Sequence, residues 1–557
     1  MIISLLIAYL IWNLVCIESN VRKARALQVP VVRIPFSVDS NIWVIFQPLV
    51  WKTLEYCLSV PWGSYPDFIR FSHRNWHFLE KSRPTDQIGS AWALVSPSSI
   101  SLHFADPDAI EEVFSRWKDF IRPVHKYGML AFYGPSVFTV GLSDWPRHRK
   151  AVAAPFDEDL MGLVWEETSR QTQTMLLNWT TAHRGKVLSL ERDLRALTFN
   201  VLASTAFQKS HDLKGDVQSG EATTETYRDT LHIVLQNAIL LMLIPYRHLT
   251  GLLIPKGLAR VGRAAASFKS ILMRIAVEET AALDRDNTTL GGLLTPLMRA
   301  LRINTSEAIT DKAKKGGLSA EEILGNIFAI NFAGHDTVLI ALNFALTLLA
   351  AHPDVRDWLR EEIVAVFGGR DRGGDEWAYE QFPKLVRCQA VFLETLRLFP
   401  PITGVPKIAT ERATSLKVGD QVVPIPSGIE VFPLLLGVQT DARYWGPDPY
   451  EWRPSRWILR PGAHLDEELL APRKGIFFPW SEGPQNCVGK KFSTVEGVAV
   501  LAQLFHGHHL YVERENDETE AEARKRAIDC ANDVNYNLLL RMNHPERVKF
   551  IVARLRE

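Results

Sequence analysis

Apolar residues recur at helical spacing over long parts of the chain, above all from Leu160 to Leu283. Ser319 and Glu322 form a capping box in front of an apolar run, which predicts a long helix that reaches about Ala351. The segment Lys384–Phe399 predicts a further helix, because its apolar residues keep the same spacing and two prolines follow it. The middle of the chain is therefore predicted to be largely helical.

Shorter segments separated by turn residues predict strands. Residues 93–95 and 100–104 flank a Pro-Ser turn, and residues 416–423 enclose a Gly-Asp turn, so each pair predicts a hairpin. Residues 428–432 predict another strand. Residues 120–140 hold aromatic residues and glycines, which predicts a long structured loop, and such loops are often functional.

The first residues form an apolar run. Residues 2–17 would make a helix roughly 24 Å long at about 1.5 Å per residue, a length that suits the thin bilayer of the endoplasmic reticulum. Arg22, Lys23 and Arg25 follow directly, and basic residues there keep the downstream chain in the cytosol. We therefore expect an N-terminal transmembrane helix. A cleaved signal peptide is the alternative, but no basic residue precedes the run and no small-residue cleavage site follows it.

This interpretation divides the chain into an anchor over residues 1–19, a linker and membrane-proximal segment over residues 20–60, and a body over residues 61–557. The apolar patch Ile42–Trp51 is too short to span a bilayer, so it either lies on the membrane surface or packs on the body. The apolar stretch Ala238–Ile244 leaves a similar choice between a buried helix and a lip that faces the membrane.

The composition excludes some classes of protein. Lys plus Arg and Asp plus Glu each number 63 among the 557 residues, so no charge excess points to nucleic acid or to an acidic partner. The five cysteines are scattered and form no Cys-x-x-Cys pair, which argues against a disulfide framework and fits a reducing compartment. A cytosolic body also predicts that the glycosylation sequons at Asn178, Asn287 and Asn304 carry no sugar.

One of the five cysteines, Cys487, lies in a sequence pattern that predicts a functional site. Cys487 lies between Gly483 and Gly489, ahead of the apolar run Val495–Phe505, and this pattern predicts a tight loop that leads into a helix. Glycines let the backbone approach a flat, bulky group, and a helix N-terminus favours the thiolate form of a cysteine. A lone thiolate suits an axial ligand to haem iron. The alternative is a structural cysteine in a glycine-rich turn.

Several other patterns place polar or charged residues at positions where a function can be expected. Asp336 and Thr337 fall in the middle of the long apolar helix, where their side chains weaken the helix, so function is expected there. Three motifs combine an arginine with an aromatic or acidic residue a few positions before it: Trp145-x-x-x-Arg149, which shares a face if Asp144 caps a helix, Glu394-x-x-Arg397 and Trp452-x-Pro-x-Arg456. Each pair alone is also explained by ordinary surface or amphipathic packing.

Together, and in this order, these motifs resemble the cytochrome P450 family, in which a cysteine thiolate holds haem. The resemblance covers nearly all of the chain after residue 30 and is strongest for fungal, membrane-anchored members. It implies a mostly helical fold with small β-sheets, and haem b between the long helix and the Cys487 loop. It names Cys487 as the iron ligand, and its other cofactor-binding residues are Trp145, Arg149, Lys407, Gly483 and Gly489.

Two positions depart from the family pattern. Trp480 stands where the family usually has phenylalanine, and Gln485 stands where it usually has arginine. The indole keeps a flat shield near the thiolate, whereas the glutamine removes a cation that would pair with a haem propionate. Arg149, Trp145 and Lys407 are then expected to carry more of that task.

The resemblance also implies roles for the remaining motifs. Glu394, Arg397 and Arg456 would form a buried network that fixes the cysteine loop. On the opposite side of the haem, Gly334 would let the long helix open. Thr337 would donate a hydrogen bond to the dioxygen being activated, and Asp336 would relay protons from water.

The electrons are expected to come from NADPH through a cytochrome P450 reductase, because the sequence contains no nicotinamide or flavin motif. Cytochrome b5 is a further candidate donor. A basic surface around the cysteine loop would bind such an acidic partner, and its expected residues are Arg473, Lys474, Lys490 and Lys491.

The expected activity is a monooxygenase that inserts one oxygen atom of O2 into a lipophilic substrate. Segments 120–140, 329–336, 401–406 and 537–540 would contact the substrate and are mainly apolar. A terpenoid or polyketide of fungal secondary metabolism is the first hypothesis, and a fatty acid or sterol the second. The rivals are a reductase-independent isomerase or dehydratase, which could dispense with Asp336 and Thr337, and a non-catalytic haem-binding protein.

Overall fold

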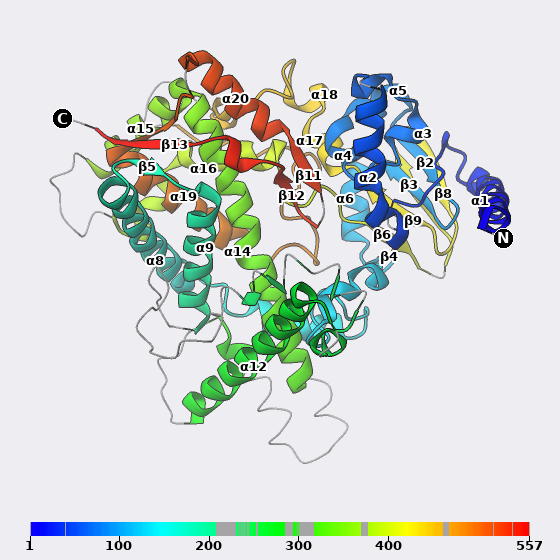
Figure 1. Cartoon of the computed structure of the whole chain (residues 1–557), viewed down its shortest axis with the longest axis horizontal. Coiled ribbons are helices and arrows are strands. Elements are labelled where there is room, and N and C mark those ends of the chain that lie inside the picture. The colour runs from blue at the N-terminus through cyan, green and yellow to red at the C-terminus, as the bar shows by residue number, and fades with distance from the viewer. Residues whose placement is uncertain are drawn as a thin grey trace.

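The computed structural model describes residues 2–555 apart from segments 208–229, 285–292, 300–316, 369–376 and 460–466 and the shorter stretches 39, 59, 232, 235–236, 238–239, 242–243, 252–253, 298, 411, 516 and 537. Helices make up most of the molecule, and a group of short strands lies beside them at one end (Figure 1). The prediction of a mostly helical fold with small β-sheets is confirmed.

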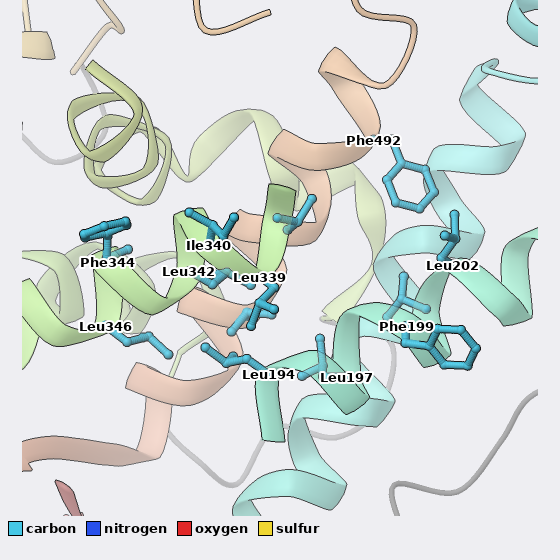
Figure 2. Packing of buried hydrophobic residues seen from close by; sticks show 14 of the residues in the cluster. Leu194, Leu197, Phe199, Leu202, Leu339, Ile340, Leu342, Phe344, Leu346 and Phe492 are labelled. Carbon is cyan, nitrogen blue, oxygen red and sulfur yellow. The ribbon is translucent and has the colours of Figure 1, made fainter. Parts of the chain in front are cut away.

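Helix α14, Ala320–Ala351, forms the centre of the helical part. Its predicted capping box is present, since the Ser319 hydroxyl accepts from the Glu322 N–H and the Glu322 carboxylate accepts from the Ser319 N–H. The helix α9, Leu190–Phe207, and the helix α19, Lys490–Gly507, pack against it through apolar side chains (Figure 2). Among the described residues, α14 alone is long and apolar enough to cross a membrane, yet 83% of its apolar window is buried inside the protein, as in a core helix.

Further helices surround this centre. The helix α8, Glu158–Leu177, packs on α19 and α9, and the helix α12, Lys256–Asp284, crosses the end of α14. The predicted helix before the double proline is α16, Val386–Leu398. It packs on both α14 and α19, and so its polar residues lie in the interior, behind the cysteine loop.

A six-stranded mixed sheet forms the other end of the molecule, in the order β1-β2-β3-β9-β6-β4. The strands are β1 Val31–Arg33, β2 Ala91–Val95, β3 Ile100–Phe104, β4 Phe120–Ile121, β6 Lys407–Ala409 and β9 Glu430–Pro433. Strands β2 and β3 are the first predicted hairpin, and β7, Thr414–Val418, with β8, Gln421–Ile425, is the second. Strand β4 pairs antiparallel with β6, Phe120 with Ala409 and Ile121 with Ile408, so Arg122, directly after β4, lies close to Lys407 at the start of β6.

The C-terminal part adds two small sheets. Strand β13, Phe550–Arg554, is the middle strand of one sheet and pairs antiparallel with β10, His508–Val512, on one side and with β5, Lys186–Val187, on the other. Strands β11, Val534–Tyr536, and β12, Leu540–Met542, form a hairpin. The backbone N–H of Leu540 donates to the carbonyl of Pro401, so this hairpin lies beside the segment that follows α16.

The N-terminal helix α1, Ile2–Ala24, has two different halves. Apolar side chains between Tyr9 and Val15 are exposed, and Trp12 is 67% exposed. Val21 and Ala24 are buried, and Asn20 Nδ2 donates to the carbonyls of Ser96 and Pro97, so the second half is docked on the sheet. That α1 spans a bilayer stays a prediction.

The apolar patch Ile42–Trp51 belongs to the helix α2, Asn41–Leu58. Trp43 and Trp51 are buried against the body, whereas Phe46 and Leu49 on the other side are more than half exposed. The patch therefore packs on the body through one face and leaves an apolar face uncovered. Most of the stretch Ala238–Ile244 lies outside the described residues.

Candidate active site

The loop that carries Cys487 is shaped by glycines and closed by its own backbone. Gly483 has φ +70°, and a Cβ there would collide with the carbonyl oxygen of Phe114, so glycine is required. The N–H of Cys487 donates to the carbonyl of Trp480 at 2.8 Å. Helix α19 starts at Lys490, so the thiol lies just ahead of a helix N-terminus, as the sequence predicts.

The surroundings of the Cys487 thiol act on its pKa in opposite directions. The side chain is accessible to solvent although protein surrounds much of it. Burial raises the pKa of the thiol, whereas a hydrogen bond from the Gly489 N–H and the charge of Arg149 lower it. Burial has the larger effect, so the pKa of the thiol lies above its usual value. The Gly489 N–H and Arg149 still favour the thiolate, which is the form that binds a metal.

Helix α7, Trp145–Ala153, carries Arg149 to this loop. The guanidinium donates to the backbone carbonyl and to Oδ1 of Asn486, both at 2.6 Å. Lys407, at the start of β6, donates to Oε1 of Gln485 at 2.6 Å. The two residues directly before Cys487 are thus each held by a cation.

Arg122 is a third cation in this region, and the sequence analysis missed it. It donates to the carbonyl of Val137 at 2.7 Å. Burial, together with the nearby Arg149, lowers its pKa, and burial together with Arg122 lowers the pKa of Lys407 to about 7. In the described part of the chain no carboxylate pairs with Arg122, Arg149 or Lys407. Neighbouring cations that are buried, as Lys407 is, or half-buried, as the two arginines are, destabilise a protein unless an anion joins them.

Trp145, on the same helix as Arg149, is buried, with its ring 5.1 Å from that of Trp117. Asp144 does not cap the helix, because its carboxylate pairs with Arg147 at 3.1 Å. The expectation of a cap at Asp144 was therefore wrong, although the helix begins where it was predicted.

Glu394 is the centre of a buried polar network. Both carboxylate oxygens accept from Arg397, at 2.8 and 2.9 Å, and one also accepts from Arg456 at 2.8 Å. Trp457 and the backbone N–H of Arg453 donate to the same carboxylate. Glu394 and Arg397 are completely buried, so this network is part of the interior and not a surface pair.

Arg397 extends the network to the backbone of the segment that follows β9. It donates to the carbonyls of Gln439, Pro449 and Glu451. The Gln439 side chain in turn accepts from the N–H of Phe478 at 2.8 Å. The network therefore reaches the first residues of the cysteine loop through one intervening glutamine.

Asp336 and Thr337 lie in the middle of α14, on turns that are fully helical. The Thr337 hydroxyl donates to the carbonyl of Ala333 at 2.8 Å. The Asp336 carboxylate is buried and is bound by Arg195 of α9 at 2.9 Å and by Arg541 of β12. Neither arginine could be predicted from the sequence, because both are distant from Asp336 in the chain.

Gly334 has a different role from the one expected. Helix α14 runs without a break through this position, so the predicted opening is absent. A Cβ at Gly334 would lie 2.9 Å from a methyl group of Leu202 on α9. The glycine thus permits close packing of the two helices.

The expected basic surface is interspersed with acids. Arg473 pairs with Asp108 at 2.7 Å, and Lys491 pairs with Glu158. Lys474 lies 3.9 Å from Glu111. Lys490 lies over the Trp480 ring at 5.5 Å. The Trp480 indole N–H donates to the Ser493 hydroxyl of α19, and so this hydrogen bond fixes the tryptophan within the loop.

These residues fit a haem. The structure gathers an accessible thiol with a stabilising N–H donor, the buried Lys407 and the half-buried Arg122 and Arg149, and none of these three basic residues has a carboxylate partner among the described residues. A haem would supply a metal for the thiolate and two propionate carboxylates for the cations. Asp336 and Thr337 belong to a different helix, and among the described residues no hydrogen bond or ion pair links them to the cysteine loop.

The comparisons with known proteins point in the same direction. The family model described as Cytochrome P450 matches residues 77–528. A cytochrome P450 monooxygenase of Arthrobotrys oligospora is 28% identical, over 98% of this chain and 97% of its own length. The cytochrome P450 monooxygenase ORF6 of Penicillium roqueforti is 26% identical over 94% and 93%. A monooxygenase of the phomenoic acid biosynthesis cluster of Leptosphaeria maculans is 26% identical over 96% and 95%. The chain belongs to the cytochrome P450 family.

Proposed function

We propose that this monooxygenase inserts one oxygen atom of O2 into a lipophilic secondary metabolite, with electrons from NADPH delivered by a reductase. The observation that carries the proposal is the Cys487 site. A hydrogen bond from the Gly489 N–H supports its thiol, and the buried Lys407 and the half-buried Arg122 and Arg149 lie around its loop with no carboxylate partner in the part of the chain that the structure describes. This arrangement suits a haem-thiolate centre and would have no clear purpose without an anionic cofactor.

Bound haem supplies the redox chemistry that activates dioxygen, and the protein holds it. Cys487 would bind the iron as thiolate, and the Gly489 N–H would stabilise the negative charge on sulfur. Arg122, Arg149 and Lys407 would bind the propionates. Gln485 cannot supply the usual cation, but it orients Lys407 by accepting its hydrogen bond.

Thr337 and Asp336 are proposed to supply protons on the other side of the site. A rotation of the Thr337 hydroxyl away from the Ala333 carbonyl would free its proton for a hydrogen bond to the reacting oxygen. Asp336 can exchange a proton with water only after Arg195 or Arg541 releases one of its oxygens. We therefore infer that the proton supply depends on movement of an arginine.

The substrate class rests on apolar surroundings and on relatives. Phe328 of α14 packs against Phe132 and Tyr133 of the 120–140 loop, and Phe268 of α12 completes this aromatic cluster. These side chains pack in the core, so the surface that α14 and this loop present to each other is apolar, and apolar surroundings suit lipophilic molecules. The relative from Leptosphaeria maculans is named for the phomenoic acid biosynthesis cluster, and this supports a role in secondary metabolism. A terpenoid or polyketide is the proposed substrate class, ahead of a fatty acid or sterol.

We propose the endoplasmic reticulum membrane as the location, with the body in the cytosol. The exposed apolar half of α1 and the exposed apolar face of α2 support this location. A cytosolic body would also meet a reductase and cytochrome b5 on the same side of the membrane.

The test is spectroscopic. The reduced carbon monoxide complex of the purified protein should show the red-shifted Soret band of thiolate ligation, and Cys487→Ala should abolish it. Cys388→Ala, at a buried cysteine away from the loop, is the control and should keep the band. A band that survives in Cys487→Ala would overturn the assignment. Substrate-dependent NADPH consumption with reductase then separates a monooxygenase from an isomerase.

A further inference from the structure

Helix α7 contacts two different parts of the molecule. Arg149 binds Asn486, next to Cys487. Arg147 and His148, which precede it, contact α14 instead: Arg147 pairs with Glu322, and His148 is completely buried against the same helix. Because α7 is a short, continuous helix, a movement of Arg147 and His148 relative to α14 must also move Arg149.

Asn326 of α14 is the residue on which these contacts converge. It is completely buried, its Oδ1 accepts from the Val137 N–H at 2.9 Å, and its Nδ2 lies 2.9 Å from Nδ1 of His148. Nδ2 also donates to the carbonyl of Glu322 at 2.7 Å. One side chain therefore joins α14, helix α7 and the loop of residues 120–140.

The hydrogen bonds fix the proton on His148. A backbone N–H can only donate, so the Asn326 atom that faces Val137 must be oxygen, and the atom that faces His148 must be the NH2 group. Nδ1 of His148 then accepts, and its proton lies on Nε2, which faces the Glu322 carboxylate at 3.4 Å. Burial opposes ionisation of Glu322, but Arg147 and the Ser319 N–H outweigh it and lower its pKa to about 2, so this carboxylate is an acceptor.

The loop is pressed against α14 at the same place. Gly325 precedes Asn326, and a Cβ there would collide with the carbonyl oxygens of Gly134 and Pro135. Gly134 has φ +143°, and a Cβ there would collide with the carbonyl of Glu321. Two glycines thus bring loop and helix backbones into direct contact beside the Asn326 hydrogen bond.

We propose that Asn326 and His148 are positioning residues that couple the substrate-facing loop to the cation that holds the haem. This inference rests on the proposed function of Arg149 and of the 120–140 loop. A substrate that displaces the loop near Val137 also displaces Asn326 through their hydrogen bond. Asn326 in turn displaces His148, and with it helix α7. The position of Arg149 beside the cysteine loop then depends on the occupancy of the substrate side.

The experiment uses full-length holoenzyme and a double-mutant cycle. Asn326→Ala removes the amide, His148→Phe keeps a ring but removes the acceptor, and the two are also combined. Thr205→Ala is the matched control, since this buried hydroxyl donates only within its own helix, to the carbonyls of Val201 and Leu202. The readouts are amide hydrogen exchange of residues 134–153 and the rate of haem transfer to an excess of apomyoglobin.

Each single variant should raise exchange at the Val137 amide and in α7, and should speed haem transfer by about fivefold, the effect of one buried hydrogen bond. The combined variant should add little to either, because both changes break the same link. Thr205→Ala should leave both readouts unchanged.

Three results would overturn the proposal: exchange that rises evenly over the whole chain, fully additive effects, or haem transfer that does not change. A protein without the thiolate band in its reduced carbon monoxide complex would instead refute the proposed function. The exchange data do not require that band, so the two failures can be told apart.

Discussion

The carboxylate of Asp336 is held by two arginines that are far apart in the chain. Arg195 lies 141 residues before it and Arg541 lies 205 residues after it. Burial opposes ionisation of this carboxylate, but the neighbouring cationic groups outweigh it and lower its pKa. A carboxylate that stays ionised and doubly bound does not release a proton, so its function as a relay requires one of the ion pairs to open.

Thr337→Ala tests the hydroxyl as a proton donor. The variant should still bind haem and consume NADPH through the reductase, but more oxygen should leave as hydrogen peroxide, and product per NADPH should fall several-fold. General acid assistance of this kind is typically worth about 10²–10⁴ in rate, and water can replace part of it. Peroxide and NADPH are measured in the same reaction. Unchanged coupling would mean that the hydroxyl only stabilises the helix through Ala333.

Asp336→Asn and Arg541→Gln together test the relay. Asp336→Asn should slow the whole cycle and also lower the melting temperature, because Arg195 and Arg541 lose their buried acceptor. Arg541→Gln frees one oxygen of Asp336 and should keep coupling or improve it, as judged by product per NADPH. Equal losses of rate in both variants would show that the ion pairs are structural and that no release step exists.

At the scale of elements, α16 is tied to the helix α15, Pro353–Phe367, through a buried carboxylate. Glu362 of α15 accepts from the N–H groups of Arg387 and Cys388 in the first turn of α16, at 2.7 and 3.1 Å. Burial raises the pKa of Glu362 to about 7, although these donors favour the ionised form. The first turn of α16, the helix that carries Glu394, is therefore bound by a carboxyl group that titrates near neutral pH.

This pKa predicts the pH dependence of stability. The folded protein holds the Glu362 proton more tightly than the unfolded chain, whose carboxylate titrates near 4.5. The contribution of Glu362 to the free energy of unfolding is therefore largest below about pH 4.5, and it is lost as the pH rises through about 7. In Glu362→Gln this fall should be absent, so the melting temperature of the variant relative to the unmodified protein should rise between pH 5 and pH 7.5. Glu361→Gln, at an exposed neighbour, should show no such change.

Local sequence patterns predicted the helices and strands, but they could not predict contacts between residues that are far apart in the chain. The Ser319 capping box and the Glu394–Arg397 pair form within a few residues, so their patterns were sufficient. The ion pair of Asp336 with Arg541 joins residues that no periodicity relates, and Arg122 meets Lys407 only through strand pairing. In the sequence, Gly334 is equally compatible with an opened helix and with close packing against another helix. Only the position of Leu202 on α9 shows that close packing is the reason for the glycine.

For the whole molecule, the N-terminus is both a proposed anchor and part of the fold. Val21, Ala24 and Leu27 are buried in the core around the sheet, whereas the side chains of α1 near Trp12 are exposed. A cut at residue 28 would therefore remove buried side chains together with the exposed half of the helix. A cut after residue 16 spares the docked half.

Deletion of residues 1–16 should move much of the protein from microsomes to the soluble fraction with its haem retained. Deletion of residues 1–28 should release it too, but with a lower melting temperature, since the loss of Val21 and Leu27 costs about 1.5–3 kcal/mol each. Retention of the shorter deletion on membranes would assign the attachment to the exposed face of α2. Sugar at Asn178, Asn287 or Asn304 would place the body in the lumen and refute the proposed location.

The β11–β12 hairpin lies beyond residue 528, where the match to the family model ends, and yet it supplies Arg541 to Asp336. A chimera that joins the first 528 residues of this chain to the tail of a relative would keep Cys487 and the Glu394 network. It would exchange one of the two groups that control the Asp336 carboxylate. If Asp336 supplies protons as proposed, tail exchange among relatives is a way to retune that supply, during evolution or by design, without any change to the residues proposed to hold the haem.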